Sequence, residues 1–129
     1  MQFWALGQDS SLWQLDSSFL PQLGPLLESG KIKGLAHITG GGFLENIPRI
    51  LPEGVGVEIN RGSWHEPPIF GMMQRLGNVA DEEMFRTFNI GIGMVAVCST
   101  SDVEKLSAEL AESRVIGKVV SGSGSVSVI

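Results

Sequence analysis

The chain has 129 residues, of which 43% are hydrophobic and 18% charged, the composition of a single globular domain rather than a disordered segment. Its net charge of −5 argues against a nucleic-acid partner, because such a partner requires a basic face. The single Cys98 excludes an internal disulfide, and its apolar neighbours predict a buried, inert thiol. The sequence contains neither an apolar run of about 18 residues nor a secretory signal, so we expect a cytoplasmic protein without a membrane partner.

The first half of the chain predicts helices and strands around a run of three glycines. Residues 1–19 show no clean hydrophobic period. After them the pattern predicts a helix over 20–29, a strand over 34–39, a helix over 43–51 and a strand over 55–59. Leu20, Leu23, Leu26 and Leu27 share one face of the first helix, which Pro25 should kink or shorten. Pro48 is tolerated in the first turn of a helix, so the second helix is expected to begin near Leu44 or Glu45.

The second half predicts further helices and strands whose order indicates the fold class. They are a helix over 67–76 begun by prolines, a helix over 81–86 with an acidic first turn, a strand over 90–98, a helix over 102–112, and strands over 115–120 and 125–129. The Ser-Gly-Ser-Gly segment between the last two strands predicts a hairpin. This order favours an α+β fold with a mixed, largely antiparallel sheet.

Gly40, Gly41 and Gly42 lie between the strand over 34–39 and the helix that follows. Consecutive glycines lose much backbone entropy on folding, so a chain retains them where the backbone must approach another group or adopt a positive φ. Before a helix, their N–H groups can bind an anion, and phosphate is the leading candidate. A tight turn without a ligand is the alternative. The spacing fits neither a P-loop nor a dinucleotide fingerprint.

Polar residues flank these glycines on both sides. His37 and Thr39 share one face of the strand, where His37 is either a base or donor to a substrate or a core histidine bonded to the backbone. Asn46, in the first helical turn, can touch a ligand or cap the helix, and the same holds for Glu45. Arg49 is the nearest cation and would pair with phosphate or form a surface salt bridge.

A second group of candidate residues lies at the start of the strand over 90–98. Arg86 and Asn89 precede it, and Gly91 and Gly93 share one of its faces. Glycines at this spacing let a ligand or another backbone approach the sheet, and a bulged strand over a helix is the alternative. Neither histidine has metal-ligand spacing to another candidate ligand, and no nucleophile triad or catalytic carboxylate pair is evident. The residues therefore identify no metal site and no catalytic residue.

Two stretches of the sequence resemble a known enzyme family. His37–Arg49 and Met84–Met94 are similar to the two signature stretches of aminoimidazole ribonucleotide synthetase, also called phosphoribosylformylglycinamidine cyclo-ligase. The resemblance covers residues 25–129 and only the C-terminal domain of that family. It implies a layered α/β sandwich. Residues 1–24 do not resemble the family, which suggests a fragment, a fusion or a degenerate gene.

The resemblance implies ATP-dependent ring closure of formylglycinamidine ribonucleotide in purine biosynthesis. Gly40–Gly42 would face a phosphate of this small-molecule substrate, beside His37, Thr39 and Asn46. Most of the ATP and Mg²⁺ site, and the main contacts of the expected homo-oligomer, a dimer, would belong to the absent N-terminal domain, so this chain alone should be inactive. The alternative is a non-catalytic phosphate- or nucleotide-binding or regulatory module of the same fold. A related synthetase of the superfamily fits less well, because the continuation Glu-Asn-Ile-Pro-Arg is typical of the cyclo-ligase.

Overall fold

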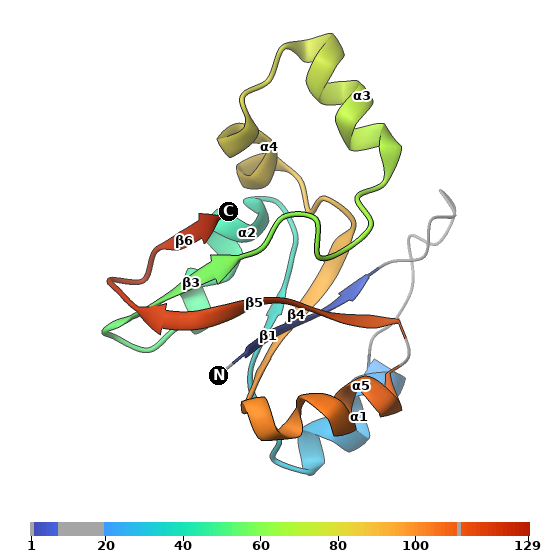
Figure 1. Ribbon diagram of the computed structural model, residues 1–129, viewed down its shortest axis with the longest axis vertical. Helices are drawn as coiled ribbons and strands as arrows, with labels where there is room; N and C mark the ends of the chain where they lie inside the picture. The colour runs from blue at the N-terminus through green and yellow to red at the C-terminus, as the bar shows by residue number, and fades with distance from the viewer. Residues whose placement is uncertain (1, 8–19, 111) are drawn as a thin grey trace.

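A computed structural model describes residues 2–7, 20–110 and 112–129 of the chain, which form a mixed sheet with helices on both faces (Figure 1). The strands are β1 (Gln2–Gly7), β2 (Ile32–His37), β3 (Val55–Ile59), β4 (Ile92–Cys98), β5 (Ser113–Ser121) and β6 (Val126–Val128). Their order in the sheet is β2-β4-β1-β5-β3-β6. All neighbours pair antiparallel except β3 and β6. The predicted α+β class with a largely antiparallel sheet is confirmed.

Strand β1 lies in the middle of the sheet, although its sequence shows no strand period. Its backbone pairs with β4 on one side, from Gln2 opposite Cys98, and with β5 on the other, from Gln2 opposite Lys118. Since β4 and β5 do not pair with each other, β1 joins the two halves of the sheet. The rest of the segment that lacks a period, residues 8–19, lies outside the described residues.

The predicted hairpin of the last two strands is wrong, because β3 lies between β5 and β6. The turn between β5 and β6 binds the start of β3: the Gly122 N–H donates to Gly54 O at 3.1 Å and the Gly124 N–H to Val55 O at 2.7 Å. These bonds hold the chain where it crosses from one side of β3 to the other, at the first residue of β3. Strand β6 then pairs parallel to β3 on its far side and becomes an edge of the sheet.

The helices follow the predicted order, but two of them are shorter than predicted. Helix α1 (Leu20–Glu28) contains Pro25, α3 spans Pro68–Gly77 and α4 spans Asp81–Thr87. The single helix predicted over 43–51 is wrong: α2 covers Gly42–Asn46, and Pro48 begins a separate 3-10 turn, η1 (Pro48–Ile50). The predicted helix over 102–112 is shorter, with a 3-10 turn η2 (Thr100–Asp102) and then α5 (Val103–Glu109).

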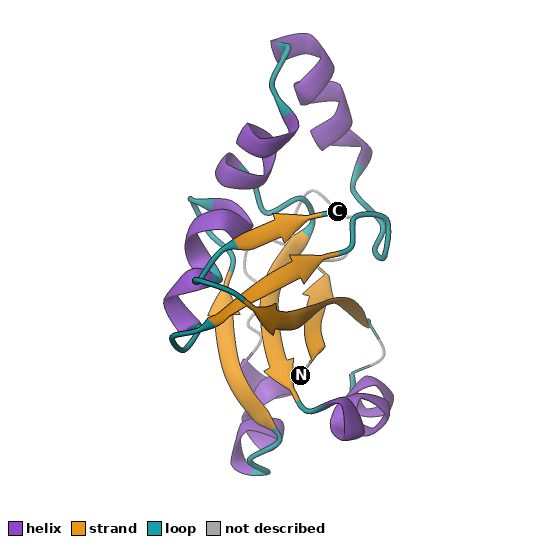
Figure 2. Ribbon diagram, turned by 60° about the vertical axis from the view of Figure 1, so that its left-hand side comes forward, coloured by secondary structure: helices purple, strands orange, loops and turns teal. Residues whose placement is uncertain are grey.

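The sheet separates two hydrophobic clusters, and β4 contributes to both by alternation. Val95 and Val97 belong to the cluster that includes residues of α2 and α4, whereas Ala96 and Cys98 face the cluster of α1 and α5. Burial raises the pKa of the Cys98 thiol, and the nearby Asp102 carboxylate adds to the shift, so the predicted buried thiol is confirmed. In Figure 2, α1 and α5 lie at the end of the molecule opposite α3 and α4.

One side chain of α1 departs from the expected inward face. Leu23 and Leu26 are buried, but Leu27 is 40% exposed. The inward face of α1 is thus narrower than the sequence indicates.

Replacing Trp4 by proline tests the central position of β1. Proline removes a backbone donor and fixes φ, which a strand paired on both sides cannot accommodate. We expect the Trp4→Pro variant to lose about 3 kcal/mol of unfolding free energy, measured by urea denaturation. Trp4→Val keeps the N–H group and is the control. Equal unfolding midpoints for the two variants would show that β1 is not held between β4 and β5.

Candidate functional site

The three glycines form a turn between the end of β2 and α2, in which Gly40 is exposed, Gly41 is half-buried and Gly42 is buried. The Ile38 N–H donates to Gly93 O at 2.9 Å, which holds the start of the turn on β4, and the Gly42 N–H donates to Thr39 O at 3.0 Å. Among the described residues, the N–H groups of Gly40, Gly41, Phe43 and Leu44 have no hydrogen-bond acceptor. The turn therefore presents several unused backbone donors, as an anion site requires.

Asn46 holds this turn from inside the protein. Its side chain is 5% exposed, and its Nδ2 donates to the carbonyl oxygens of Gly42 at 2.8 Å, Gly40 at 3.2 Å and Thr39 at 3.3 Å. Its Oδ1 accepts from Thr39 Oγ1 at 3.4 Å and from Arg49 at 3.5 Å. An amide has only two N–H hydrogens, so these bonds leave it none for a ligand. Asn46 thus positions the turn.

Gly42 brings together the two stretches that carry the family resemblance. A Cβ at this buried position would overlap the carbonyl oxygen of Phe85 and lie 2.8 Å from that of Phe88. Its φ of +55° also strains any residue with a side chain. The start of α2 therefore rests directly on the backbone at the end of α4.

Aromatic rings continue this contact into the core. The ring of Phe43 lies 5.8 Å from that of Trp64, edge to face, and 5.8 Å from that of Phe85, stacked on it. The indole N–H of Trp64 donates to Ile90 O at 2.9 Å, which ties the same cluster to the start of β4. Such pairs contribute about 0.5–1.5 kcal/mol each beyond the area that they bury.

The predicted residues of the second group are engaged with other parts of the protein. Arg86 is exposed and pairs with Glu82 at 2.9 Å and Glu83 at 3.6 Å on its own helix. The Oδ1 of Asn89 accepts the N–H of Gly91 at 3.2 Å and so closes the turn before β4. A Cβ at Gly91 would lie 2.5 Å from Cδ of Pro67, and Gly93 accepts the Ile38 N–H. The space beside Gly91 is thus taken by Pro67, and the backbone of Gly93 is paired with that of Ile38.

The side chains around the turn carry both charge signs. His37 is exposed at the end of β2, so the core-histidine alternative is wrong, and Arg49 is exposed in η1. The Glu45 carboxylate lies against Gly41, with Oε2 2.7 Å from the position of a Cβ there. A carboxylate at this place opposes an anion on the neighbouring N–H groups.

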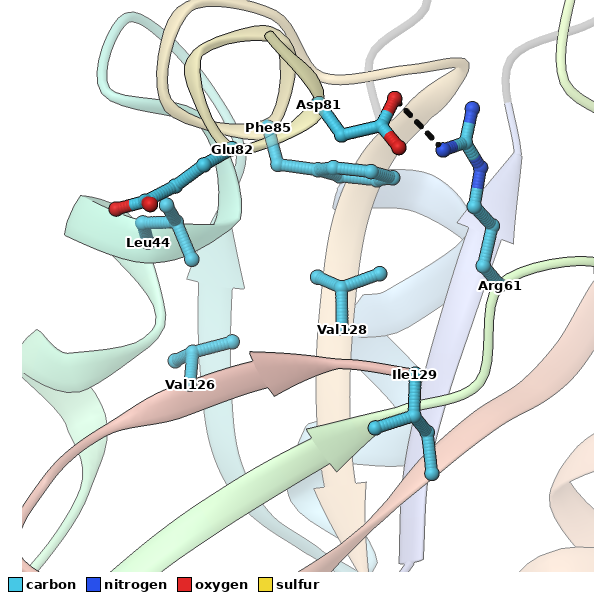
Figure 3. A pocket seen from close by; sticks show the side chains of 8 residues that line it. All are labelled: Leu44, Arg61, Asp81, Glu82, Phe85, Val126, Val128 and Ile129. Atoms are coloured by element: carbon cyan, nitrogen blue, oxygen red, sulfur yellow. Dashed lines mark ion pairs between the residues drawn. The ribbon is translucent and has the colours of Figure 1, made fainter.

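A cavity of about 460 Å³ lies beside α4 and contains none of the site residues predicted from the sequence (Figure 3). Its lining residues come from α2, the β3–α3 loop, α4 and the C-terminal segment: Leu44, Arg61, Asp81, Glu82, Phe85, Val126, Val128 and Ile129. Leu44 is its link to the glycine turn. The sequence gives no signal for this cavity, because its residues meet only in the folded chain.

Arg61 crosses one side of the cavity and joins the β3–α3 loop to α4. Its guanidinium binds Glu66 at 3.0 and 3.2 Å and Asp81 at 3.1 Å, and lies 5.2 Å from the ring centre of Phe85. The bond to Glu66 and the weaker one to Asp81 raise the pKa of Arg61. Hydrogen bonds from Gln74 and then Arg61 lower the pKa of Asp81, so the carboxylate is ionised when it pairs.

The described residues contain no group of three or more His, Cys, Asp or Glu side chains that could hold a metal ion. None of the described helices has the length and apolar character needed to cross a membrane.

Residues 19–129 match the protein family described as the C-terminal domain of AIR synthase related protein. The chain belongs to this family. A phosphoribosylformylglycinamidine cyclo-ligase from Caldanaerobacter subterraneus subsp. tengcongensis is 53% identical over 105 residues, which are 78% of this chain and 31% of that protein. The protein of the same name from Methylobacillus flagellatus is 55% identical over 85 residues, or 66% of this chain and 25% of its own length. The chain thus spans about a third of the length of the curated relatives that it matches.

A solved structure supports the fold of this AIR synthase related domain. The crystal structure of E. coli HypE, a hydrogenase maturation protein, superimposes with a TM-score of 0.66 at 21% identity and covers 98% of this chain and 45% of its own. At this identity the likeness concerns the fold alone. The layered α/β sandwich implied by the family resemblance is confirmed.

Alanine substitutions at Gly42 and Gly40 test whether the close backbone contact at Gly42 contributes to stability. Gly42→Ala is expected to lose about 3 kcal/mol of unfolding free energy, because the new Cβ meets the carbonyl oxygens of Phe85 and Phe88 at a positive φ. Gly40→Ala places its Cβ in open space, and we expect a change within about 0.5 kcal/mol. Urea denaturation measures both. A Gly42→Ala protein as stable as Gly40→Ala would contradict the contact.

Removing the guanidinium of Arg61 tests its link to α4. Arg61→Met is expected to cost about 1–2 kcal/mol, because a bidentate pair and a ring contact are lost together. Arg86→Met is the matched control and should cost at most about 0.5 kcal/mol, since its pairs are exposed and lie within one helix.

The pH dependence of this difference provides a second check. The pKa of Asp81 is lowered in the folded state, so its contribution is present above the ordinary Asp value and disappears as the pH falls through the lowered one. We therefore expect the difference in unfolding free energy between Arg61→Met and Arg86→Met to become smaller in acid. An unchanged difference would contradict the ion pair of Arg61 with Asp81.

Proposed function

We propose that this chain is the substrate-side domain of a phosphoribosylformylglycinamidine cyclo-ligase, in which ATP drives closure of the imidazole ring of aminoimidazole ribonucleotide. The observation that carries the proposal is the turn of Gly40–Gly42, in which the N–H groups of Gly40 and Gly41 have no acceptor among the described residues. The turn forms where the two family stretches meet. The names of the curated relatives support the same reaction.

In this proposal the glycine turn binds a phosphate group of the ribonucleotide. The N–H groups of Gly40, Gly41 and Phe43 donate to its oxygens, and Arg49 supplies a positive charge from η1. His37 and Thr39 lie beside it at the end of β2. Ring closure through a phosphorylated formyl oxygen needs fixed donors around phosphoryl charge, and donors held in place by Asn46 meet this need.

The remaining predicted residues support the site from behind. Asn89 and Gly93 fix the start of β4, against which the turn is hydrogen-bonded, and Gly91 lets Pro67 pack there. Arg86 stays a candidate for substrate contact only if it leaves its partners on α4. We also propose that residues 25–129 are the cyclo-ligase C-terminal domain and that residues 1–24 come from outside the family. Strand β1, which belongs to residues 1–24, completes the sheet of residues 25–129.

Mg²⁺ does not fit the described residues, because no cluster of acidic or histidine side chains is available to hold it. We therefore assign Mg²⁺ and most of the ATP site to the part of the family protein outside this chain, and we propose that the chain alone has no turnover. The cytoplasmic location and the homo-oligomer are proposed with the family role. A non-catalytic phosphate- or nucleotide-binding module is the second candidate, because the part of the chain that the structure describes has a turn with unused backbone donors but no metal-binding cluster.

Isothermal titration with formylglycinamidine ribonucleotide and with ATP, separately and together, tests the proposal. We expect the ribonucleotide to bind and to shift the amide resonances of Gly40, Gly41 and Phe43 in NMR spectra. Binding of ATP at the turn without any binding of the ribonucleotide would favour the non-catalytic module. Binding of neither would overturn the phosphate site.

Substituting Glu45 tests the electrostatics of the turn. Glu45→Gln removes the carboxylate beside Gly41 and should lower the dissociation constant of inorganic phosphate about fivefold, because the repulsion is lost. Amide-shift titration measures the constant. Glu104→Gln, an exposed change on α5 at the far end of the molecule, should leave it unaltered. The same constant for both variants would place the anion elsewhere.

A further inference from the structure

A strained turn precedes β4. The Ile92 N–H donates to Asn89 O at 2.9 Å, and the two residues between them, Ile90 and Gly91, have φ values of +50° and +88°. Positive φ at both central positions is the mark of a type I′ turn. Asparagine and glycine enter this left-handed region easily, whereas a β-branched residue there is an outlier. Ile90 therefore holds an unfavourable backbone conformation.

Two side chains hold the peptide group between Ile90 and Gly91 by its two polar ends. Nε1 of Trp64 donates to Ile90 O at 2.9 Å, and Oδ1 of Asn89 accepts the Gly91 N–H at 3.2 Å. The Ile90 side chain is 2% exposed and belongs to the larger hydrophobic cluster, as does Trp64. A strained residue persists only where its surroundings determine its conformation, and these contacts supply that restraint.

The strained turn lies between two backbone positions that hold the glycine turn. Phe88, just before it, has its carbonyl oxygen 2.8 Å from the position of a Cβ at Gly42. Gly93, just after it, accepts the Ile38 N–H at 2.9 Å. The glycine turn is thus held at its start by one of these positions and at its end by the other. Their separation depends on the shape of the Asn89–Ile92 turn that joins them.

The loop between β3 and α3 supports both turns. Besides its bond to Ile90, Trp64 meets the ring of Phe43 edge to face, with the ring centres 5.8 Å apart. The N–H group of Phe43 is one of the proposed phosphate donors. Pro67, from the same loop, packs on Gly91, with its Cδ 2.5 Å from the position of a Cβ there. Trp64 therefore joins the strained turn to the residue that follows the glycines.

We propose that Trp64 is a positioning residue for the phosphate site of the glycine turn, an inference that rests on the proposed function. By binding the carbonyl oxygen of Ile90, Trp64 keeps the Asn89–Ile92 turn in its strained form. That form sets the spacing of the two contacts that hold the glycine turn, and so the direction of its unused N–H groups. The indole N–H is already bonded to Ile90, so Trp64 acts through the backbone and not on the anion.

The variant Trp64→Phe tests this role, because it keeps an aromatic ring beside Phe43 and removes the donor to Ile90. Residual dipolar couplings, measured by NMR without any ligand, report the orientation of the N–H groups of Gly40 and Gly41. We expect these couplings to change in Trp64→Phe. The dissociation constant of inorganic phosphate, from amide-shift titration, should rise about tenfold, the effect of one misaligned hydrogen bond to a charged group.

Leu106→Val is the matched control for a loss of stability. Leu106 is 0% exposed and lies in the cluster of α1 and α5, on the other face of the sheet. Both variants should lower the thermal unfolding midpoint, because one leaves a buried carbonyl oxygen without a donor and the other removes buried packing. Only Trp64→Phe should alter the couplings and the phosphate constant. Equal changes in Leu106→Val would overturn the inference, since they would follow from destabilisation alone.

Adding Ile90→Asn to Trp64→Phe tests the strain itself. The substitution puts the Asn-Gly pair that type I′ turns favour at the centre of the turn, so the conformation no longer depends on the indole. We expect the couplings and the phosphate constant to return toward those of the unaltered chain, although the buried amide lowers the unfolding midpoint further. A general loss of structure would not produce recovery of binding at lower stability.

Unchanged couplings in Trp64→Phe would overturn the inference, and so would a double variant that folds without recovering them. If the double variant does not fold, the comparison of Trp64→Phe with Leu106→Val decides. If the unaltered chain binds no inorganic phosphate at the glycine turn, the proposed function fails. The couplings still decide the role of Trp64 in that case, because they are measured without a ligand, so the two failures are distinguishable.

Discussion

The absence of a side chain at Gly42 is the constraint on which the rest of the site depends. It allows the start of α2 to rest on the carbonyl oxygens of Phe85 and Phe88, at a distance that no other residue permits. The next residue, Phe43, is then placed between the rings of Trp64 and Phe85. One close backbone contact thus sets both the path of the glycine turn and the packing of the larger hydrophobic cluster.

Asn46 determines which way the backbone carbonyl and N–H groups of this turn point. Because its amide binds the carbonyl oxygens of Thr39, Gly40 and Gly42 from the buried side, those oxygens are held inward. The neighbouring N–H groups of Gly40 and Gly41 have no acceptor among the residues that the structure describes. A buried amide that satisfies three carbonyl oxygens therefore leaves the N–H groups of Gly40 and Gly41 on the other side of the turn. Without Asn46 the same glycines would be free to turn their carbonyl oxygens outward.

Local pattern predicted most of the elements, and the errors in the sheet have one physical origin. Strands β3 and β4 were predictable because their apolar residues are the ones that are buried. Helices α3 and α4 were predictable from the prolines and the acidic turn at their starts, although no residue of α3 is buried. The central position of β1 was not predictable, because it depends on pairing with β4 and β5, which lie about 90 and about 110 residues away in the chain. The hairpin of β5 and β6 failed for the same reason, since the bonds of Gly122 and Gly124 to β3 decide it. In the site, residue types indicated an anion turn, but the inward role of Asn46 depends on burial that no local pattern reveals.

Phe88 links the glycine turn to helix α3. Its carbonyl oxygen faces Gly42, and its ring contacts Phe70 on the attached face of α3. Arg61 restrains the other end of α4 through Asp81, so α4 has little freedom to move away from the turn. The position of the glycine turn and the attachment of α3 therefore both depend on Phe88, through its carbonyl oxygen and its ring.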